Sequence, residues 1–300
     1  MTCSEKNGSV TVTGVTGLDI YRTFDCGQCF RFDPDPEGGI SGVAFGRFVR
    51  FEQPEPGTLI VHGATAGDFD EIWSPFLDLS RDYGEYARAF ADDPTLTAAA
   101  KTADGIRILR QDPWETLCSF IISQNNNIPR IKGLVERLSR TYGDPIDAPR
   151  GTAYSFPTAE TLAAVSEEDI FALKTGFRAK YISDAARRVA SGDISLEAVA
   201  KLPTPEAEKE LCRIKGVGPK VAACALLFGF GRGDAFPVDV WVRRVLDEYY
   251  PDGFDIAALG DSAGIAQQYL FYYRRYEVRE EVQKHTNAIS NGRGGVPPPP

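Results

Sequence analysis

The sequence has no long apolar run, because charged or polar residues interrupt every hydrophobic stretch. A helix that crosses a bilayer needs about 20 consecutive, mostly apolar residues, so we expect no membrane span and no membrane partner. The first ten residues, MTCSEKNGSV, lack the basic and then apolar plan of a secretory signal. We therefore expect a cytoplasmic protein with an ordinary core, since 43% of the residues are hydrophobic.

Residues that commonly bind metals are scarce. His62 and His285 are the two histidines, and Cys26 and Cys29 form the one CxxC pair among six cysteines. Zinc and iron–sulfur sites use several ligands at short spacings, and no second pair follows. We expect no metal and no other cofactor, and we expect the cysteines to be reduced and mostly buried.

Charge is distributed unevenly along the chain. The formal net charge of −9 by itself disfavours a nucleic-acid partner. Residues 1–111 carry 10 basic and 17 acidic residues, whereas residues 112–300 carry 23 and 25. Within the second part, basic residues outnumber acidic ones in 130–140, 174–188 and 213–244. Such windows are usually solvated helix faces, but three of them together keep a DNA-binding surface open as an alternative.

The order of the expected elements is that of an α+β protein. Residues 1–62 contain runs of β-forming residues between Gly, Pro and Asp turns, which predict strands. From about residue 67 the apolar residues recur with helical spacing. Asp112 and Thr204 each precede or begin such a pattern beside a proline, and we expect both to cap helices. Strands followed by a run of helices indicate α+β rather than alternating units.

The segment IKGVGPK lies between two helical patterns and contains Gly216, Val217 and Gly218. Glycine tolerates positive φ and leaves room beside the backbone, so a phosphate could approach the N–H groups at the start of the next helix. A plain tight turn between helices explains the same residues. The sequence leaves both interpretations open.

Lys220 and Asp239 lie in the most apolar part of the chain. Partial withdrawal from water at a helix N-terminus disfavours the charged form of a lysine and would make a neutral amine available as a nucleophile. On spacing alone, a phosphate-binding or snorkelling lysine is favoured. An aspartate before a helical pattern is usually an N-cap, but Asp239 could also stabilise a cationic transition state.

Five short motifs occur in an order that resembles one enzyme family. They are CGQCFRF at 26–32, SQNNNIPRIKGLVERL at 123–138, GFRAKYI at 176–182, LCRIKGVGPKVAAC with FPVDVWVRRVL between 211 and 246, and AQQYLF at 266–271. Over about residues 20–280 the chain resembles the eukaryote-like 8-oxoguanine DNA glycosylase/AP lyases of the helix-hairpin-helix superfamily. The resemblance implies a TBP-like antiparallel sheet in a β-rich N-terminal domain, followed by a two-part helical region.

Domain boundaries follow from this resemblance. The β-rich domain would cover residues 1–111. One helical domain, with the catalytic aspartate and the lesion pocket, would combine 112–130 and 220–288, and the other would cover 131–219 and end in the hairpin. The composition of 289–300 predicts a disordered tail.

The resemblance also implies a chemistry and a partner. Lys220 matches the family's catalytic lysine, which attacks C1′ of the damaged nucleoside, expels the base and forms a Schiff base. β-Elimination then nicks the strand. Asp239 matches the aspartate that supports the cationic sugar. The partner would be double-stranded DNA containing 8-oxoguanine, bound by a monomer.

Four further matches imply a pocket for a base flipped out of the duplex. Gly27 corresponds to the glycine whose carbonyl senses the N7–H of the oxidised purine. Cys224 and Phe271 correspond to the pair that sandwiches the base, and Gln267 to the residue that binds its Watson–Crick edge. On the residues alone, a turn glycine and core packing explain the first three.

The opposite strand would be recognised by another set. Asn125 matches the residue that fills the vacated stack, Arg130 and Arg178 match two arginines that recognise the orphan cytosine, and Phe177 stands where the family has an aromatic wedge. A helix-ending loop and solvated faces explain these residues without DNA. Trp241 departs from the family, which often has a histidine near a DNA phosphate at this position.

Two other functions fit parts of the pattern. A glycosylase for other damaged bases, such as alkylated ones, would share the hairpin, but Lys220 counts against it. A non-catalytic helix-hairpin-helix module would bind DNA through the hairpin alone, and the matches at Lys220, Asp239 and the pocket count against that.

Overall fold

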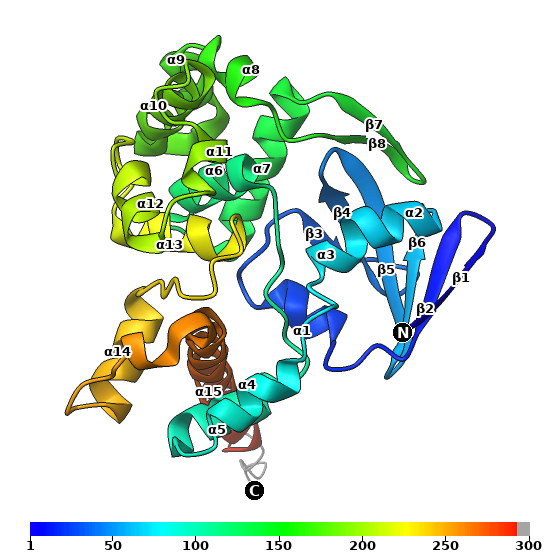
Figure 1. The fold of residues 1–300 in the computed structure, drawn as a ribbon, viewed down its shortest axis with the longest axis vertical. Coiled ribbons are helices and arrows are strands. Elements are labelled where there is room, and N and C mark those ends of the chain that lie inside the picture. The colour runs from blue at the N-terminus through cyan, green and yellow to red at the C-terminus, as the bar shows by residue number, and fades with distance from the viewer. Residues whose placement is uncertain (293–300) are drawn as a thin grey trace, which may run out of the picture.

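The computed structural model describes residues 1–292, with side chains described through residue 277. Figure 1 shows three groups of elements, one built on a β-sheet and two made of helices, which meet near the short helix α1. The α+β class predicted from the sequence is confirmed.

The first group is a six-stranded antiparallel sheet. Its strands are β1 (Thr2–Lys6), β2 (Ser9–Thr13), β3 (Phe32–Pro34), β4 (Ile40–Ala44), β5 (Arg47–Glu55) and β6 (Thr58–His62). They lie in the order β1-β2-β6-β5-β4-β3. Val10 and Val12 of β2 and Leu59 and Val61 of β6 are buried at alternate positions, as expected for a sheet with one covered face. Beyond the short α2 (Ala66–Asp68), which buries no residue, that face is covered in part by the π-helical segment Phe69–Trp73 and by α3 (Ser74–Phe76).

The predicted run of strands over residues 1–62 is interrupted by α1 (Ile20–Asp25). The side chain of Asp19 caps this helix by accepting the N–H of Arg22 at 3.0 Å. Ile20 and Phe24 bury their side chains against the sheet. Six residues are too few for a helical period to stand out in the sequence, and α1 leads directly into the CGQC turn.

The second group contains the central helices. These are α6 (Pro113–Ser123), α7 (Ile128–Tyr142), α8 (Ala159–Ala163), α9 (Glu167–Ile170), α10 (Ala179–Ala190), α11 (Leu196–Val199), α12 (Thr204–Leu211) and α13 (Pro219–Phe228). They share one hydrophobic core, in which Leu117 of α6, Val135 of α7 and Ala222 of α13 are completely buried.

The third group joins helices that are far apart in the sequence. It contains α4 (Tyr83–Ala89), α5 (Pro94–Thr102), α14 (Val240–Tyr249) and α15 (Ala263–Gly292). Phe90 and Ala99 share its core with Val245 and Leu270. Figure 1 shows these helices together at one end of the molecule, away from the sheet.

The cores therefore divide the helical region differently from the predicted domains. The boundaries at residues 130 and 220 do not separate two cores, because α6 and α13 pack with α7 to α12. The helices of residues 83–102, predicted within the β-rich domain, instead pack with α14 and α15. α15 extends to Gly292, past the start of the tail predicted at residue 289, and residues 293–300 lie outside the described part of the chain.

Two predicted helix caps have different outcomes. Asp112 is the N-cap of α6, and its Oδ1 accepts the N–H of Glu115 at 2.8 Å. The cap predicted at Thr204 is wrong, because Pro203 is the N-cap of α12 and the hydroxyl of Thr204 donates to Asp234 at 2.7 Å.

Within residues 1–292, no helix combines the length and apolar character that a membrane span requires.

A small hairpin that the sequence did not predict connects two groups. β7 (Pro145–Ala148) and β8 (Gly151–Tyr154) pair antiparallel, and Figure 1 shows them reaching from the central helices toward the sheet. At their turn, Arg150 forms ion pairs with Asp35 at 3.2 Å and Glu37 at 2.7 Å. The hairpin thus attaches the central helices to the edge of the sheet that carries β3.

Candidate active site

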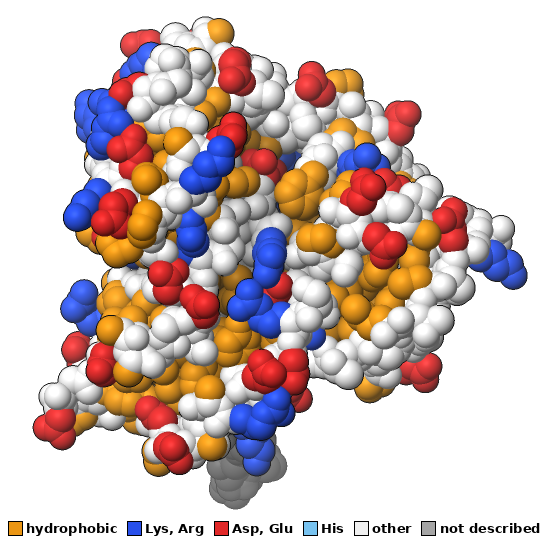
Figure 2. Space-filling model, in the orientation of Figure 1, with side chains coloured by type: hydrophobic (Ala, Val, Ile, Leu, Met, Phe, Trp, Pro, Cys, Tyr) orange, Lys and Arg blue, Asp and Glu red, His pale blue; other side chains and the backbone are white. Residues whose placement is uncertain are grey.

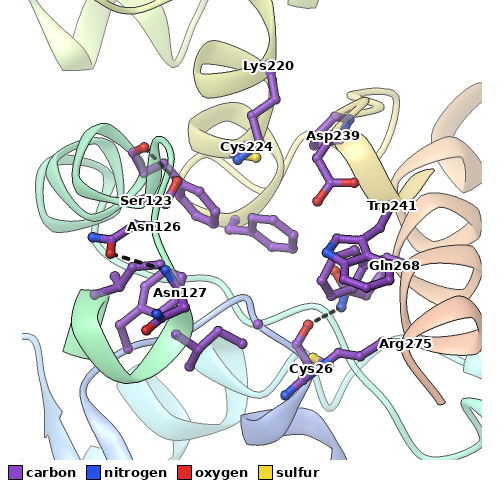
Figure 3. Close-up of a pocket in the computed structure, with 18 of the residues that line it drawn as sticks. Cys26, Ser123, Asn126, Asn127, Lys220, Cys224, Asp239, Trp241, Gln268 and Arg275 are labelled. Atoms are coloured by element: carbon purple, nitrogen blue, oxygen red, sulfur yellow. Dashed lines mark hydrogen bonds between the residues drawn. The ribbon is translucent and has the colours of Figure 1, made fainter. Parts of the chain in front are cut away.

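A cavity of about 520 Å³ lies where the three groups meet. Five segments line it: the CGQC turn, the end of α6 with the start of α7, α13, residues 237–241, and α15. Six residues predicted for the site line this one cavity, namely Gly27, Lys220, Cys224, Asp239, Gln267 and Phe271. Figure 3 shows Lys220 and Asp239 on the same side of it, both pointing inward.

Lys220 is the second residue of α13 and is half-buried. Every residue from Val221 to Phe228 is buried, so the helix is fixed in the core while its first turn reaches the cavity. The Nζ atom of Lys220 lies 5.3 Å from the ring centroid of Phe120, where the face of an aromatic ring attracts an ammonium. The availability of a neutral amine stays a prediction.

Cys224 lies one helical turn after Lys220 and is 3% exposed. Burial raises the pKa of its thiol to about 11, although the neighbouring Lys220, which hydrogen bonds to it, acts in the opposite direction. A thiol with this pKa stays protonated near neutral pH and is a poor nucleophile. Cys224 is therefore a neutral wall of the cavity, and Lys220 is the stronger candidate for covalent chemistry.

Asp239 is the N-cap of α14, as the commonest interpretation of its position predicted. Its Oδ1 accepts the N–H of Val242 at 2.8 Å, which fixes the orientation of the carboxylate. Figure 3 shows this carboxylate facing the cavity. Asp239 can therefore cap α14 and also act in the cavity, because the hydrogen bond that caps the helix orients the carboxylate toward the cavity.

Gly27 lies in the turn between α1 and β3 with φ of +82°. This left-handed conformation is costly for residues with a Cβ. A Cβ built at Gly27 would lie 3.4 Å from Cε1 of Phe271 and 3.6 Å from Cδ1 of Ile128. The glycine thus brings main chain, without a side chain, into the wall of the cavity.

The neighbouring Gln28 anchors this turn. It is completely buried, and its Nε2 donates to the carbonyls of Thr23 at 3.0 Å and Arg107 at 2.7 Å. Its Oε1 accepts the N–H of Leu109 at 2.9 Å. Burial raises the pKa of both flanking thiols, Cys26 and Cys29, to about 12, so the CxxC pair is protonated near neutral pH.

α15 supplies the opposite wall. Gln267 is 4% exposed, and its buried Oε1 has no hydrogen-bond partner among the described residues. An unpaired buried acceptor costs about 1–3 kcal/mol, so an orphan oxygen at a cavity wall marks a place where a ligand can donate. Phe271, one turn further on, adds an aromatic face to the same cavity.

The structure also adds residues that the motifs did not single out. Phe120 lies beneath Lys220, Asn126 and Asn127 line the cavity, and Gln268 and Arg275 approach it from α15. Trp241, which departs from the family pattern, also lines the cavity, and the guanidinium carbon of Arg244 lies 5.4 Å from its ring centroid. Gln268 and Arg275 recur with Phe271 at helical spacing, which is the one signal that could have suggested them.

Two family models match consecutive parts of the chain. Residues 10–117 match the family model of the 8-oxoguanine DNA glycosylase N-terminal domain, and residues 118–253 match that of the HhH-GPD superfamily base excision DNA repair proteins. An N-glycosylase/DNA lyase of Arabidopsis thaliana is 34% identical over 244 residues, which cover 78% of this chain and 67% of the relative.

Two solved structures are similar over nearly their whole length. The 8-oxoguanine glycosylase/lyase of Clostridium acetobutylicum, in complex with double-stranded DNA containing cytosine opposite 8-oxoG, is 38% identical with a TM-score of 0.88. MBOgg1, in complex with a low-affinity DNA ligand, is 43% identical with the same TM-score. Each match covers 92% of this chain and 98% of the other. This chain belongs to the 8-oxoguanine DNA glycosylase family.

In this family member, the residues predicted to contact the opposite strand lie outside the cavity. Asn125 is exposed and has φ of +49°, at the turn between α6 and α7. Asn127 caps α7 by accepting the N–H of Arg130 at 3.0 Å, and the side chain of Arg130 is exposed. The SQNNN motif therefore both ends one helix and starts the next, with Asn125 at its outermost point.

Arg178 has a different environment from the one predicted. It is 3% exposed, and its guanidinium donates to the carbonyls of Gln124, Asn125 and Thr175. Burial and the nearby Arg130 lower its pKa. In this conformation Arg178 holds the SQNNN turn in place, so recognition of cytosine by Arg178 stays a prediction that requires its guanidinium to leave these carbonyls.

Phe177 is 44% exposed, as a wedge residue requires, and its ring is 4.5 Å from the guanidinium carbon of Arg178. On its other side lies Tyr181, at a centroid distance of 5.9 Å. The ring of Tyr181 also lies against the hairpin: a Cβ at Gly216 would be only 2.4 Å from its Cγ. One aromatic ring, that of Tyr181, thus contacts both Phe177 and the hairpin.

The hairpin joins α12 to α13 with the geometry of an exposed turn. Gly216 has φ of +79°, and the side chain of Val217 is buried, so only its main chain can meet a ligand. No atom lies within 4 Å of a Cβ built at Gly218, the N-cap of α13. The main chain is open there, and Lys215 is fixed beside it because its N–H donates to Asp184 at 2.8 Å.

Basic side chains gather at the middle of the face in Figure 2, where the three groups meet, and again along the edge formed by the central helices. Along that edge they alternate with acidic side chains, in agreement with the near-balance of charge after residue 111.

Among residues 1–277, no group of three or more His, Cys, Asp or Glu side chains could hold a metal ion.

Proposed function

We propose that this protein excises 8-oxoguanine from duplex DNA, preferably opposite cytosine, and then nicks the strand at the resulting abasic site. The observation that carries the proposal is the cavity itself, which brings a lysine, a fixed carboxylate and an unpartnered buried amide oxygen together. A damaged base inside a duplex cannot reach such a site, so the nucleotide must be flipped out.

The nitrogen of Lys220 is the nucleophile. Its lone pair forms a bond to C1′, the bond from C1′ to N9 breaks, and the base leaves with that electron pair and takes up a proton. Opening of the sugar ring gives the Schiff base, and loss of a proton from C2′ expels the 3′ phosphate by β-elimination. Lys220 is suited to this because α13 holds it rigidly at the cavity while Phe120 excludes water beneath it.

Asp239 stabilises the positive charge that develops on the sugar as the base departs. Its orientation is set in advance by the bond to the N–H of Val242, so no reorganisation is needed in the transition state. This arrangement makes Asp239 an electrostatic group rather than a second nucleophile.

The base lies between Cys224 and Phe271. Gln267 accepts a hydrogen bond from the Watson–Crick edge through the oxygen that has no described partner. The carbonyl of Gly27 accepts the N7–H, which 8-oxoguanine has and guanine lacks. Discrimination thus depends on one hydrogen atom and on a main-chain acceptor that cannot rotate away.

Outside the cavity, Phe177 wedges into the duplex, while Asn125 fills the vacated stack and Arg130 and Arg178 recognise the orphan cytosine. Gly216, Val217 and Gly218 bind a backbone phosphate through main-chain N–H groups. Because phosphate contacts release counterions, binding should weaken steeply with salt. We expect the enzyme to act as a monomer without a cofactor and to be cytoplasmic.

Two assays test the function. A duplex with 8-oxoguanine opposite each of the four bases should be cleaved fastest opposite cytosine, and sodium borohydride should trap a covalent protein–DNA adduct. Excision of alkylated bases but not of 8-oxoguanine would assign the other glycosylase specificity. Binding without excision or trapping would leave only a DNA-binding module.

A further inference from the structure

Side chains donate to four main-chain carbonyls in residues 23–28, which form the end of α1 and the start of the CGQC turn. Two of the donors belong to α15, one is Gln111, and one is the buried Gln28 of the turn itself. They are Gln28 to the carbonyl of Thr23 at 3.0 Å, Arg275 to that of Asp25, Gln268 to that of Cys26 at 2.8 Å, and Gln111 to that of Gln28 at 2.8 Å.

Between these held carbonyls, Gly27 is different. Among the described residues, none donates a hydrogen bond to its carbonyl. Glycine is also the residue with the widest conformational freedom. A glycine carbonyl points in a defined direction only when the peptide units on both sides of it are fixed, so the surrounding bonds decide where this acceptor is aimed.

Gln268 fixes the unit before Gly27. Its side chain is 2% exposed, and its Nε2 reaches the carbonyl of Cys26, which shares a peptide plane with the N–H of Gly27. Figure 3 shows this bond at the floor of the cavity. After Gly27, the side-chain bonds of Gln28 fix that residue, and Gln111 holds the next peptide by donating to the carbonyl of Gln28.

Arg275 strengthens the same connection two turns further along α15. It donates to the carbonyl of Asp25 and pairs with the carboxylate of that residue at 3.2 Å. α15 therefore carries base-contacting side chains, Gln267 and Phe271, on the same helix as the two donors that clamp the turn across the cavity.

We propose that Gln268 is a positioning residue for lesion recognition: it clamps the Cys26–Gly27 peptide to α15 and thereby aims the Gly27 carbonyl at the N7–H of the flipped base. Arg275 assists through Asp25. This inference rests on the proposed function, because it assigns a cause to the selectivity of that same pocket. It concerns recognition of the base and not the covalent step at Lys220.

The test is Gln268→Met, which keeps the length of the side chain and removes the donor. Single-turnover excision of 8-oxoguanine opposite cytosine should fall by about 5- to 150-fold, the range for one misplaced hydrogen bond. Cleavage of a preformed abasic site, which has no base to recognise, should change by less than about twofold, within the scatter of single-site effects on stability.

Tyr250→Phe is the matched control. It removes partly buried hydrogen bonds to Asp93 at the edge of the core that α15 shares, but it does not touch the CGQC turn. If Gln268 only stabilises the fold, both variants should lower the melting temperature and both activities in parallel. The proposal requires that only Gln268→Met separates excision from abasic-site cleavage.

A second variant, Arg275→Met, tests the proposal in case Gln268→Met folds poorly. Arg275→Met removes the donor to Asp25 at a side chain that is 18% exposed, and a smaller separation in the same direction is expected. Wild-type protein that does not excise 8-oxoguanine would overturn the proposed function. Wild-type excision with no separation in either variant would overturn the role of Gln268 and leave the function standing.

Discussion

Replacing Gly27 with alanine tests whether a main-chain carbonyl selects the lesion. The structure predicts two separate costs. With φ of +82°, an alanine would be held in the left-handed region, which costs roughly 1–2 kcal/mol of folding free energy. Its Cβ would lie 3.4 Å from Phe271 and 3.6 Å from Ile128, so it fits with shifts of a few tenths of an ångström. The protein should therefore fold with a modestly lower melting temperature.

The second cost falls on recognition. The new methyl group would contact the ring of Phe271, where the base is proposed to lie, and the strained φ would tilt the carbonyl away from N7. Loss of that hydrogen bond should cost about 1–3 kcal/mol in the excision step, or about 5- to 150-fold in rate. Cleavage of a ready-made abasic site should stay close to the wild-type rate, since Lys220 and Asp239 are untouched. Both rates are measured under single turnover with the same preparation. Equal losses in both reactions, or no loss in either, would show that Gly27 is an ordinary turn residue and would contradict the reasoning.

Three more outcomes are expected. Lys220→Gln should still bind DNA with 8-oxoguanine in a mobility-shift assay but lose excision and borohydride trapping, because an amide cannot form a Schiff base; trapping at the wild-type yield would place the nucleophile elsewhere. Arg130→Leu should lower the ratio of excision rates opposite cytosine and opposite adenine more than it lowers the rate opposite adenine, and an unchanged ratio would remove Arg130 from base recognition. Burial raises the pKa of Glu115 to about 7, with Arg31 opposing and Asp112 adding to the shift. Because the folded state holds this proton more tightly than the unfolded state, the stability it contributes is complete below about pH 4.5 and is lost as pH rises through about 7. Glu115→Gln should flatten the pH dependence of urea stability over that interval, and an unchanged slope would mean that another group titrates there.

The sequence motifs predicted the catalytic cavity more fully than the fold around it. Lys220 and Asp239 are charged residues in the most apolar part of the chain, Gly27 was singled out by the resemblance, and all three line one cavity. The alternation of Val10 and Val12 was likewise enough to predict a strand, because one face of the sheet is buried.

Features that depend on contacts between distant segments were not predictable in this way. β7 and β8 are four residues each with no buried side chain, so their sequence is too short and too weakly apolar to mark a strand. Arg178 lies in a basic window that suggests exposure, yet carbonyls brought together by the end of α6 bury its guanidinium. The contact of Gln268 was not predictable for the same reason, because the carbonyl that it binds belongs to Cys26, near the other end of the chain.

The hydrogen bond from Gln268 to Cys26 joins residues 242 positions apart. Closing a free loop of that length costs on the order of 5 kcal/mol in chain entropy. Contacts between such distant residues form late in folding, because this loss must be overcome before they stabilise anything. The sheet and the central helices can therefore assemble while the turn at Gly27 is still unclamped, and during refolding the recovery of base excision should lag behind the recovery of helical circular dichroism.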